Sequence, residues 1–339
     1  MCGGDAVLKS PGFSWDCFGS NGDKLIEHEN AYEYEEHHEL LVDLISGDPA
    51  TFGATPWILT LQYGRVEDAR KMLDANLILT ETLSKPASVG YIGSVFFSAT
   101  MLASVYHIHG LSQQVRHLFT LLGLTFDNAD ERLATVTKPS KSITALDHKG
   151  ARGGLWSLRR SIWQVKVLCI LNLDVPESKA IVWLKSLPDN EAYYAYSMTL
   201  PTSNVGAVAQ TYHACWIALA HEKYGLHDGA LRFADLQLEP DALKGGTPLT
   251  KWPQVIALAC KGRVLASLDR HDEALAAFQA AIATSKESYS LMEALAYREL
   301  ANYVGGGAAA VQAGKDLEMK LAEFEGRLTR DDFKSVTIT

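Results

Sequence analysis

Apolar positions recur along most of the chain at helical spacing, in paired segments separated by a short turn. Four places share one plan: a long apolar helix, a short turn, and a second helix that opens with polar residues. They read YGRVEDARKML (63–73), HGLSQQVRHLF (109–119), YGLHDGALRFA (224–234) and LDRHDEALAAF (268–278). No sustained apolar/polar alternation leads into a hairpin-turn sequence, so strand signals are weak. The pattern predicts an all-α protein built from antiparallel helical hairpins.

In the first three places a glycine follows an aromatic residue or a histidine at the end of the first helix: Gly64, Gly110 and Gly225. Glycine there can take the left-handed conformation that closes a helix. The second helix carries a small residue on its inner face. These equivalent residues are Ala69, Val115, Ala230 and Ala274, at intervals of 46, 115 and 44.

The long interval leaves room for one more hairpin, in which helix 155–171 is followed by a turn and by a helix with Ala180 as its inner residue. A last hairpin is predicted to run from Tyr289 to Tyr303, turn at 305–307 and return through 308–324. A first helix is expected at 31–45, ending at Ser46-Gly47.

The chain is therefore expected to hold about six hairpins, with a period near 44 to 50 residues. They occupy residues 25–325, after an irregular leader at 1–24 and before a polar C-terminal tail at 326–339. Connectors rich in Gly, Pro, Ser and Thr at 138–154, 187–206 and 240–253 are typical of loops between hairpins.

One segment, Leu258–Ile282, resembles a tetratricopeptide (TPR) motif. Gly262 lies in its first helix, Ala274 follows twelve residues later, then Phe278 and Ala281. The resemblance implies close packing of two helices at the small residues, with the aromatic ring filling the groove between hairpins. The specific motif covers only residues around 255–285, and the period exceeds the usual TPR period of 34 by about ten residues.

The resemblance further implies a right-handed superhelix, an α-solenoid, whose first helices line a concave face that binds a peptide or partner protein. Some TPR proteins carry a clamp of Lys, Arg and Asn there for a C-terminal carboxylate. The corresponding positions here include Cys215, Ala259 and Cys260, which leaves Arg263 as a candidate binding residue without the rest of a clamp.

Charge is unevenly distributed along the chain. Residues 25–64 hold eight acidic side chains and no Lys or Arg, whereas residues 138–166 are strongly basic. Such asymmetry usually reflects solvated faces. The functional interpretation is that the basic segment binds an acidic or phosphorylated partner through Lys149, Arg152, Arg159 and Arg160. A third interpretation is head-to-tail self-association, acidic end to basic middle.

Composition narrows the class of protein. The net charge of −9 argues against general nucleic-acid binding, and 47% apolar residues are typical of a folded chain. The five cysteines form neither a disulfide framework nor a zinc site, which favours a reducing, cytoplasmic setting. No signal-peptide pattern is present. Residues 89–108 have the length of a membrane span, but their Ser, Thr, His and Gly content favours a helix buried among other helices.

Candidate chemistry is sparse. His28, His37 and His38 lie in an acidic stretch, but adjacent histidines diverge on a helix, which favours a solvated face over a metal site. His107 and His109 favour capping and core packing, because residues two apart point to nearly opposite sides of a helix. Neither a phosphate-binding loop nor a nucleophile elbow occurs. The sequence thus offers no catalytic residue, metal ligand or cofactor site.

The sequence favours a protein-protein interaction scaffold or adaptor. The alternative is that the chain is the helical-repeat arm of a larger ATP-dependent regulator or enzyme. RNA binding by a helical array is disfavoured by the acidic total and by the lack of a repeated base-reading pair.

Overall fold

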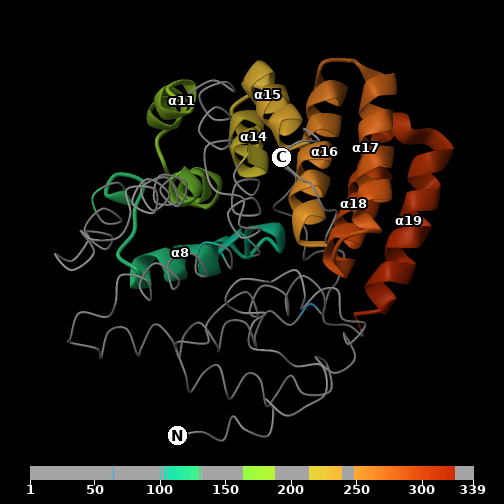
Figure 1. Cartoon of the computed structure of the whole chain (residues 1–339), viewed down its shortest axis with the longest axis horizontal. Helices are drawn as coiled ribbons and strands as arrows, with labels where there is room; N and C mark the ends of the chain where they lie inside the picture. The colour runs from blue at the N-terminus through green and yellow to red at the C-terminus, as the bar shows by residue number, and fades with distance from the viewer. Residues whose placement is uncertain are drawn as a thin grey trace, which may run out of the picture.

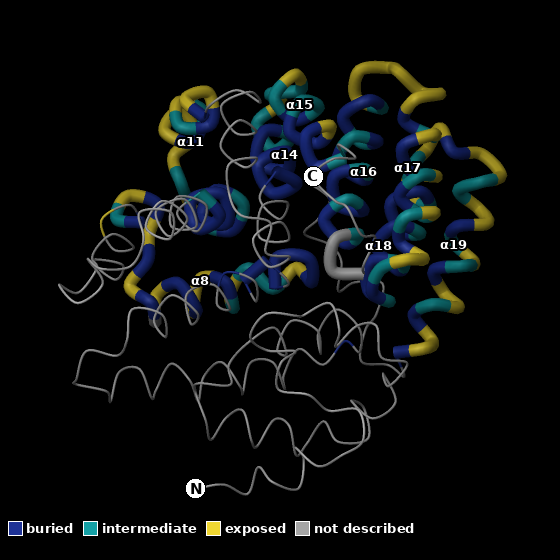
Figure 2. Tube along the Cα trace, viewed as in Figure 1, coloured by how far each residue is buried: buried dark blue, intermediate teal, exposed yellow. Residues whose placement is uncertain are grey.

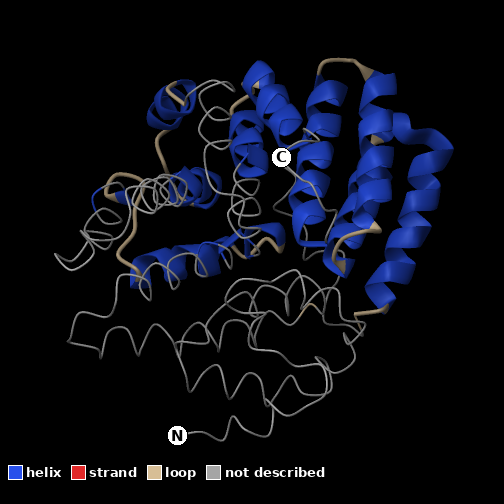
Figure 3. Ribbon diagram, viewed as in Figure 1, coloured by secondary structure: helices blue, strands red, loops and turns tan. Residues whose placement is uncertain are grey.

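The structure is a computed structural model that describes residues 64, 100, 103–104, 106–129, 131, 163–187, 214–238 and 248–324. Across these ranges the secondary structure is helical, with no strand (Figure 3). The all-α prediction is confirmed for this part of the chain. The predicted helix at 31–45, the hairpin around Ala69, the leader at 1–24 and the tail at 326–339 lie outside it.

The C-terminal part is formed by three consecutive hairpins (Figure 1). The helices of each hairpin contact each other, and the first helices also contact in turn, α14 with α16 and α16 with α18. The second helix of one hairpin further contacts the first helix of the next, α15 with α16 and α17 with α18. The hairpins pair α14 (Ala214–Lys223) with α15 (His227–Leu238), α16 (Pro248–Ser267) with α17 (His271–Ser285), and α18 (Ser290–Asn302) with α19 (Gly307–Ala322).

The last hairpin was predicted closely, with a short 3-10 turn η5 (Val304–Gly306) at the expected glycines. Towards the N-terminus, the described helices are 106–108, α8 (Ser112–Leu121), residues 163–172 and α11 (Glu177–Lys185). α11 contacts α14 and so adjoins the three C-terminal hairpins.

The turns share one backbone geometry. A residue with positive φ lies five positions before the inner small residue in each of the four places: Gly64 (φ 67°), Gly110 (φ 77°), Gly225 (φ 64°) and Asp269 (φ 58°). In three of these turns the next N–H donates to a carbonyl five residues back, the pattern that closes a helix. These bonds run from Leu111 to Tyr106 (2.8 Å), Leu226 to His221 (2.9 Å) and Arg270 to Leu265 (2.9 Å).

The TPR-like segment packs closely at its glycine. A Cβ added at Gly262 would lie 2.6 Å from Cε1 of Phe278, so the ring of α17 rests directly on the α16 backbone. Phe278 is 2% exposed, and its ring centroid lies 5.2 Å from that of Tyr303 in the next hairpin. Ala230, Ala274 and Ala281 are fully buried. The aromatic side chain therefore bridges two hairpins.

The first helix α14 is closed off from solvent along most of its length. Every residue of α14 from Ala214 to His221 is buried, which leaves no open face on that part of the helix. Most exposed positions of the three C-terminal hairpins lie on the turns and on the second helices (Figure 2). An open concave face lined by first helices is therefore absent at Ala214–His221. The right-handed superhelix expected from the TPR resemblance stays a prediction.

Candidate functional site

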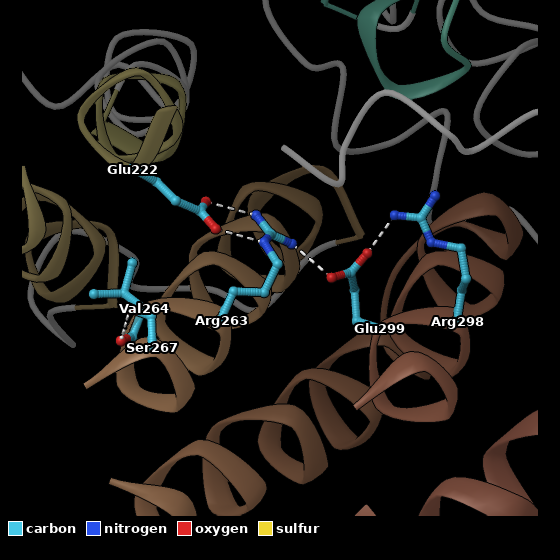
Figure 4. A network of polar contacts seen from close by, with 6 residues as sticks. All are labelled: Glu222, Arg263, Val264, Ser267, Arg298 and Glu299. Atoms are coloured by element: carbon cyan, nitrogen blue, oxygen red, sulfur yellow. Dashed lines mark hydrogen bonds and ion pairs between the residues drawn. The ribbon is translucent and has the colours of Figure 1, made fainter. Parts of the chain in front are cut away.

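A buried ionic network crosses the first helices of the three hairpins (Figure 4). Arg263 of α16 donates two hydrogen bonds to Glu222 of α14, from Nε to Oε1 at 2.7 Å and from Nη2 to Oε2 at 2.8 Å. Its third nitrogen, Nη1, donates to Oε2 of Glu299 on α18 at 2.6 Å. Arg298 donates to the other oxygen of Glu299. One guanidinium thus joins carboxylates from two neighbouring hairpins.

The network is deeply buried, and each carboxylate in it contacts a guanidinium group. The side chains of Arg263 and Glu222 are 15% and 12% exposed, and those of Arg298 and Glu299 are 4% and 2% exposed. Burial on its own would raise the pKa of Glu299, but the guanidinium groups of Arg263 and Arg298 bring the pKa below its ordinary value. Glu299 therefore stays ionised inside the helical core, between two guanidinium groups.

This arrangement decides the role of Arg263. The sequence left that residue as a candidate for binding an external carboxylate, but its guanidinium is occupied by Glu222 and Glu299. The nearby thiol of Cys260 is buried, and burial with the adjacent Glu222 carboxylate raises its pKa well above the ordinary value. The network therefore links neighbouring hairpins through internal ion pairs.

A neutral polar network holds the N-terminal helices. Nδ1 of His107 donates to Oδ1 of Asn172 at 2.9 Å, and Ser112 Oγ donates to the same oxygen at 3.1 Å. Burial lowers the pKa of His107 from 6.5 to about 4, so the ring is neutral at physiological pH. The ring also packs edge-on against Trp216 of α14, at 5.7 Å between centroids.

A second neutral network lies in the segment that has the length of a membrane span. Gln164 Nε2 donates to Ser104 Oγ at 2.9 Å, and Ser104 Oγ donates to the carbonyl of Thr100 at 2.9 Å. All three residues are buried. The described polar residue Ser104 of this segment therefore contacts another helix of the protein, at Gln164. Within the described ranges, no helix combines the length and apolarity that crossing a membrane requires.

Lys223, the last residue of α14, connects the C-terminal hairpins to helix 163–172. Its Nζ donates to the carbonyls of Ile170 at 2.6 Å and Leu171 at 3.4 Å, near the end of helix 163–172. A cation there also interacts favourably with the negative end of the helix dipole. Burial lowers the pKa of Lys223.

Lys166, at the end of the basic segment, is 9% exposed. Its Nζ lies over the rings of Phe126 at 5.3 Å and Trp183 at 5.8 Å. This member of the segment is therefore directed into the protein. The candidate binding residues of the segment, Lys149, Arg152, Arg159 and Arg160, lie outside the described residues, as do His28, His37 and His38.

The described cysteines, at positions 169, 215 and 260, are buried thiols that form no disulfide bond. Burial raises the pKa of Cys169 to about 12, so its thiol is unreactive at neutral pH. His107 and His109 are both buried, in keeping with the expected packing role. Among the described side chains, no three His, Cys, Asp or Glu residues are grouped closely enough to hold a metal ion.

Sequence reasoning missed the ionic network, although a signal was present. Glu222, Arg263 and Glu299 are charged residues within largely apolar first helices. Buried charges are seldom found unpaired, so opposite charges on the first helices of neighbouring hairpins indicate partners.

Comparison of the chain with protein-family models, curated proteins and solved structures gives no match.

Proposed function

We propose that the protein is a TPR-like interaction scaffold that binds a peptide or partner protein. The observation that supports this most directly is the turn geometry: a positive-φ residue lies five positions before the inner residue at four places in the chain. A repeated hairpin plan with hairpins in mutual contact is the architecture of proteins that offer extended binding surfaces.

The binding surface differs from the one that the TPR resemblance implies. Residues 214–221 of the α14 first helix are closed, and Arg263 is engaged internally. The proposal therefore places the partner on the second helices and the turns, together with the basic segment around Arg159 and Arg160. An acidic or phosphorylated partner suits that segment, because paired guanidinium groups form charge-assisted hydrogen bonds with carboxylates and phosphates. The buried free thiols are compatible with a reducing, cytoplasmic setting.

Affinity capture from cell extract, followed by mass spectrometry, tests the proposal. The wild type is compared with the double variant Arg159→Glu/Arg160→Glu. The control for the basic segment is Lys185→Glu/Lys286→Glu, which makes the same change in net charge at two exposed positions at the ends of second helices, outside that segment. We expect a partner that is retained by the control and lost from the Arg159/Arg160 variant.

Circular dichroism of each variant shows whether the fold is intact. Partners retained equally by both variants would remove the basic segment from the proposal and leave the second helices and turns. Turnover of ATP or another substrate by the purified chain, with no partner captured, would contradict the scaffold and favour the enzyme-arm alternative.

A further inference from the structure

The last described helix carries an exposed apolar face. Ala313, Leu317 and Leu321 of α19 are buried on the side towards α18. On the opposite side, Val311 is 65% exposed and Met319 is 63% exposed. Terminal repeats of helical arrays usually have polar outer faces. Large apolar side chains in this position therefore indicate a contact surface.

The exposed stripe is symmetric in sequence. It consists of Ala308, Val311, Lys315, Met319 and Ala322, all exposed and spaced by 3, 4, 4 and 3 residues. At about 100° per residue, all five lie within about 40° of Lys315 on the helix surface. The pattern is the same in either direction along the helix, with Lys315 at its centre.

Such symmetry is what an isologous contact requires, because each copy must present the same patch to the other. We propose that α19 packs antiparallel against α19 of a second copy of the chain, with Lys315 at the two-fold axis. Val311 of one copy then lies against Met319 of the other, and Ala308 lies against Ala322. The small residues at both ends let the two helices approach closely.

The charges on this face fit the same arrangement. Lys315 and Glu318 are both exposed and lie one turn apart on α19. In the antiparallel pair, each Lys315 lies within one helical turn of Glu318 of the second copy. The two central cations are thereby balanced by two carboxylates across the contact.

The size of the surface sets the strength of the contact. α19 has 16 residues, and at 1.5 Å per residue it is about 24 Å long. A contact along one such helix is smaller than the roughly 800 Å² per partner of a standard stable interface. The dimer is therefore weak and concentration-dependent. It differs from the head-to-tail self-association that the sequence permitted, since it closes on itself.

Disulfide trapping tests the axis directly. Lys315→Cys and Gln312→Cys are made separately in full-length protein that also carries Cys2→Ser and Cys17→Ser. A cysteine on the two-fold axis meets its own copy within disulfide reach, whereas position 312 is displaced along the helix and away from the axis. We expect mild oxidation to form the covalent dimer at least about tenfold faster with Lys315→Cys than with Gln312→Cys. Equal rates would mean random collision and would overturn the proposal.

Analytical ultracentrifugation over a concentration series supplies a readout without introduced cysteines. We expect the sedimentation coefficient of the wild type to rise with concentration, and Val311→Lys/Met319→Lys to abolish the rise. Both positions are exposed, so the fold is expected to survive, which circular dichroism checks. A wild type that stays monomeric at every concentration would overturn the proposal. The stripe would then be the contact surface of residues 325–339 or of a different protein. The Arg159→Glu/Arg160→Glu capture experiment changes the basic segment and leaves the α19 stripe intact, so the two proposals fail separately.

Discussion

The two described parts of the chain bury polar side chains between helices in chemically different ways. Around residues 100–187 the buried contacts are mostly neutral, made by His107, Asn172, Gln164 and Ser104. Across residues 214–324 the corresponding contact is fully ionic. Both join helices from separate hairpins. Helices of separate hairpins are therefore joined by amide, hydroxyl and imidazole groups in one part and by guanidinium and carboxylate groups in the other.

The difference determines how each part responds to damage. Removing one partner of a neutral buried hydrogen bond costs about 1–3 kcal/mol, the desolvation of the group that remains. Removing one partner of a buried ion pair costs about 3–5 kcal/mol, because an uncompensated charge is left behind. The dependence of stability on pH differs as well, since a buried neutral imidazole affects stability at a higher pH than a paired carboxylate does.

The largest effect is expected at the ionic network. Glu299→Ala removes a buried carboxylate that both Arg263 and Arg298 contact. We expect the free energy of unfolding, measured by urea titration, to fall by about 3–5 kcal/mol. The control is Glu273→Ala, which removes an exposed ion pair with Arg270 and should cost far less, because water screens that pair. Equal losses in the two variants would show that the network contributes no more than a surface pair.

The second prediction concerns pH and the neutral network. The pKa of His107 is about 4 in the folded protein, against 6.5 ordinarily. Below pH 6.5 the His107 imidazole is protonated in the unfolded chain, whereas in the folded protein it stays neutral down to about pH 4. The free energy of unfolding should therefore fall across that window, by about 3 kcal/mol in total from this group.

The pKa of Glu299 is also lowered in the folded protein, but for the opposite reason, because neighbouring guanidinium groups favour its charged form. Its stabilisation is therefore present above the unfolded pKa and is lost as pH falls through the folded pKa. Urea titrations of wild type and His107→Gln at several pH values separate the two groups. We expect the variant to lack the His107 contribution between pH 6.5 and 4 while keeping the more acidic loss. Parallel pH profiles for both proteins would contradict the buried, neutral imidazole.

The smallest predicted effect compares two equivalent turns. At Gly225, φ is 64° and a Cβ would meet nothing within 4 Å, so the cost of Gly225→Ala is purely conformational. We expect a loss of about 1–2 kcal/mol. At Asp269 the same conformation is already held by a residue with a side chain, and Asp269→Gly should change stability by less than about 1 kcal/mol. Thermal unfolding of both variants checks the pair, and a costly Asp269→Gly would mean that the aspartate side chain stabilises the turn.

The local features of the fold could be predicted from the sequence. The glycine positions, the small inner residues and the last hairpin are encoded within one or two helical turns, where spacing alone indicates geometry. The return segment was expected at 308–324, and α19 spans Gly307–Ala322. Asp269 shows the limit of the glycine rule, because another residue occupies the same left-handed position.

The long-range features could not be predicted in the same way. Arg263 lies 41 residues after Glu222 and 36 before Glu299, so its partners depend on how the hairpins are rotated against one another. Helical periodicity does not contain that rotation. It also does not show that α14 is closed over 214–221, since an apolar first helix suits both a buried core and a groove.

The burial of α14 has a consequence for the order in which backbone amides exchange with deuterated water. A helix without an open face cannot detach alone, so its central amides should exchange only through cooperative opening of the surrounding helices. α19, with one side exposed, can open at lower free energy. Within the three C-terminal hairpins, deuterium would then enter at α19 first and reach α14 last. These hairpins would lose α19 well before they lost α14.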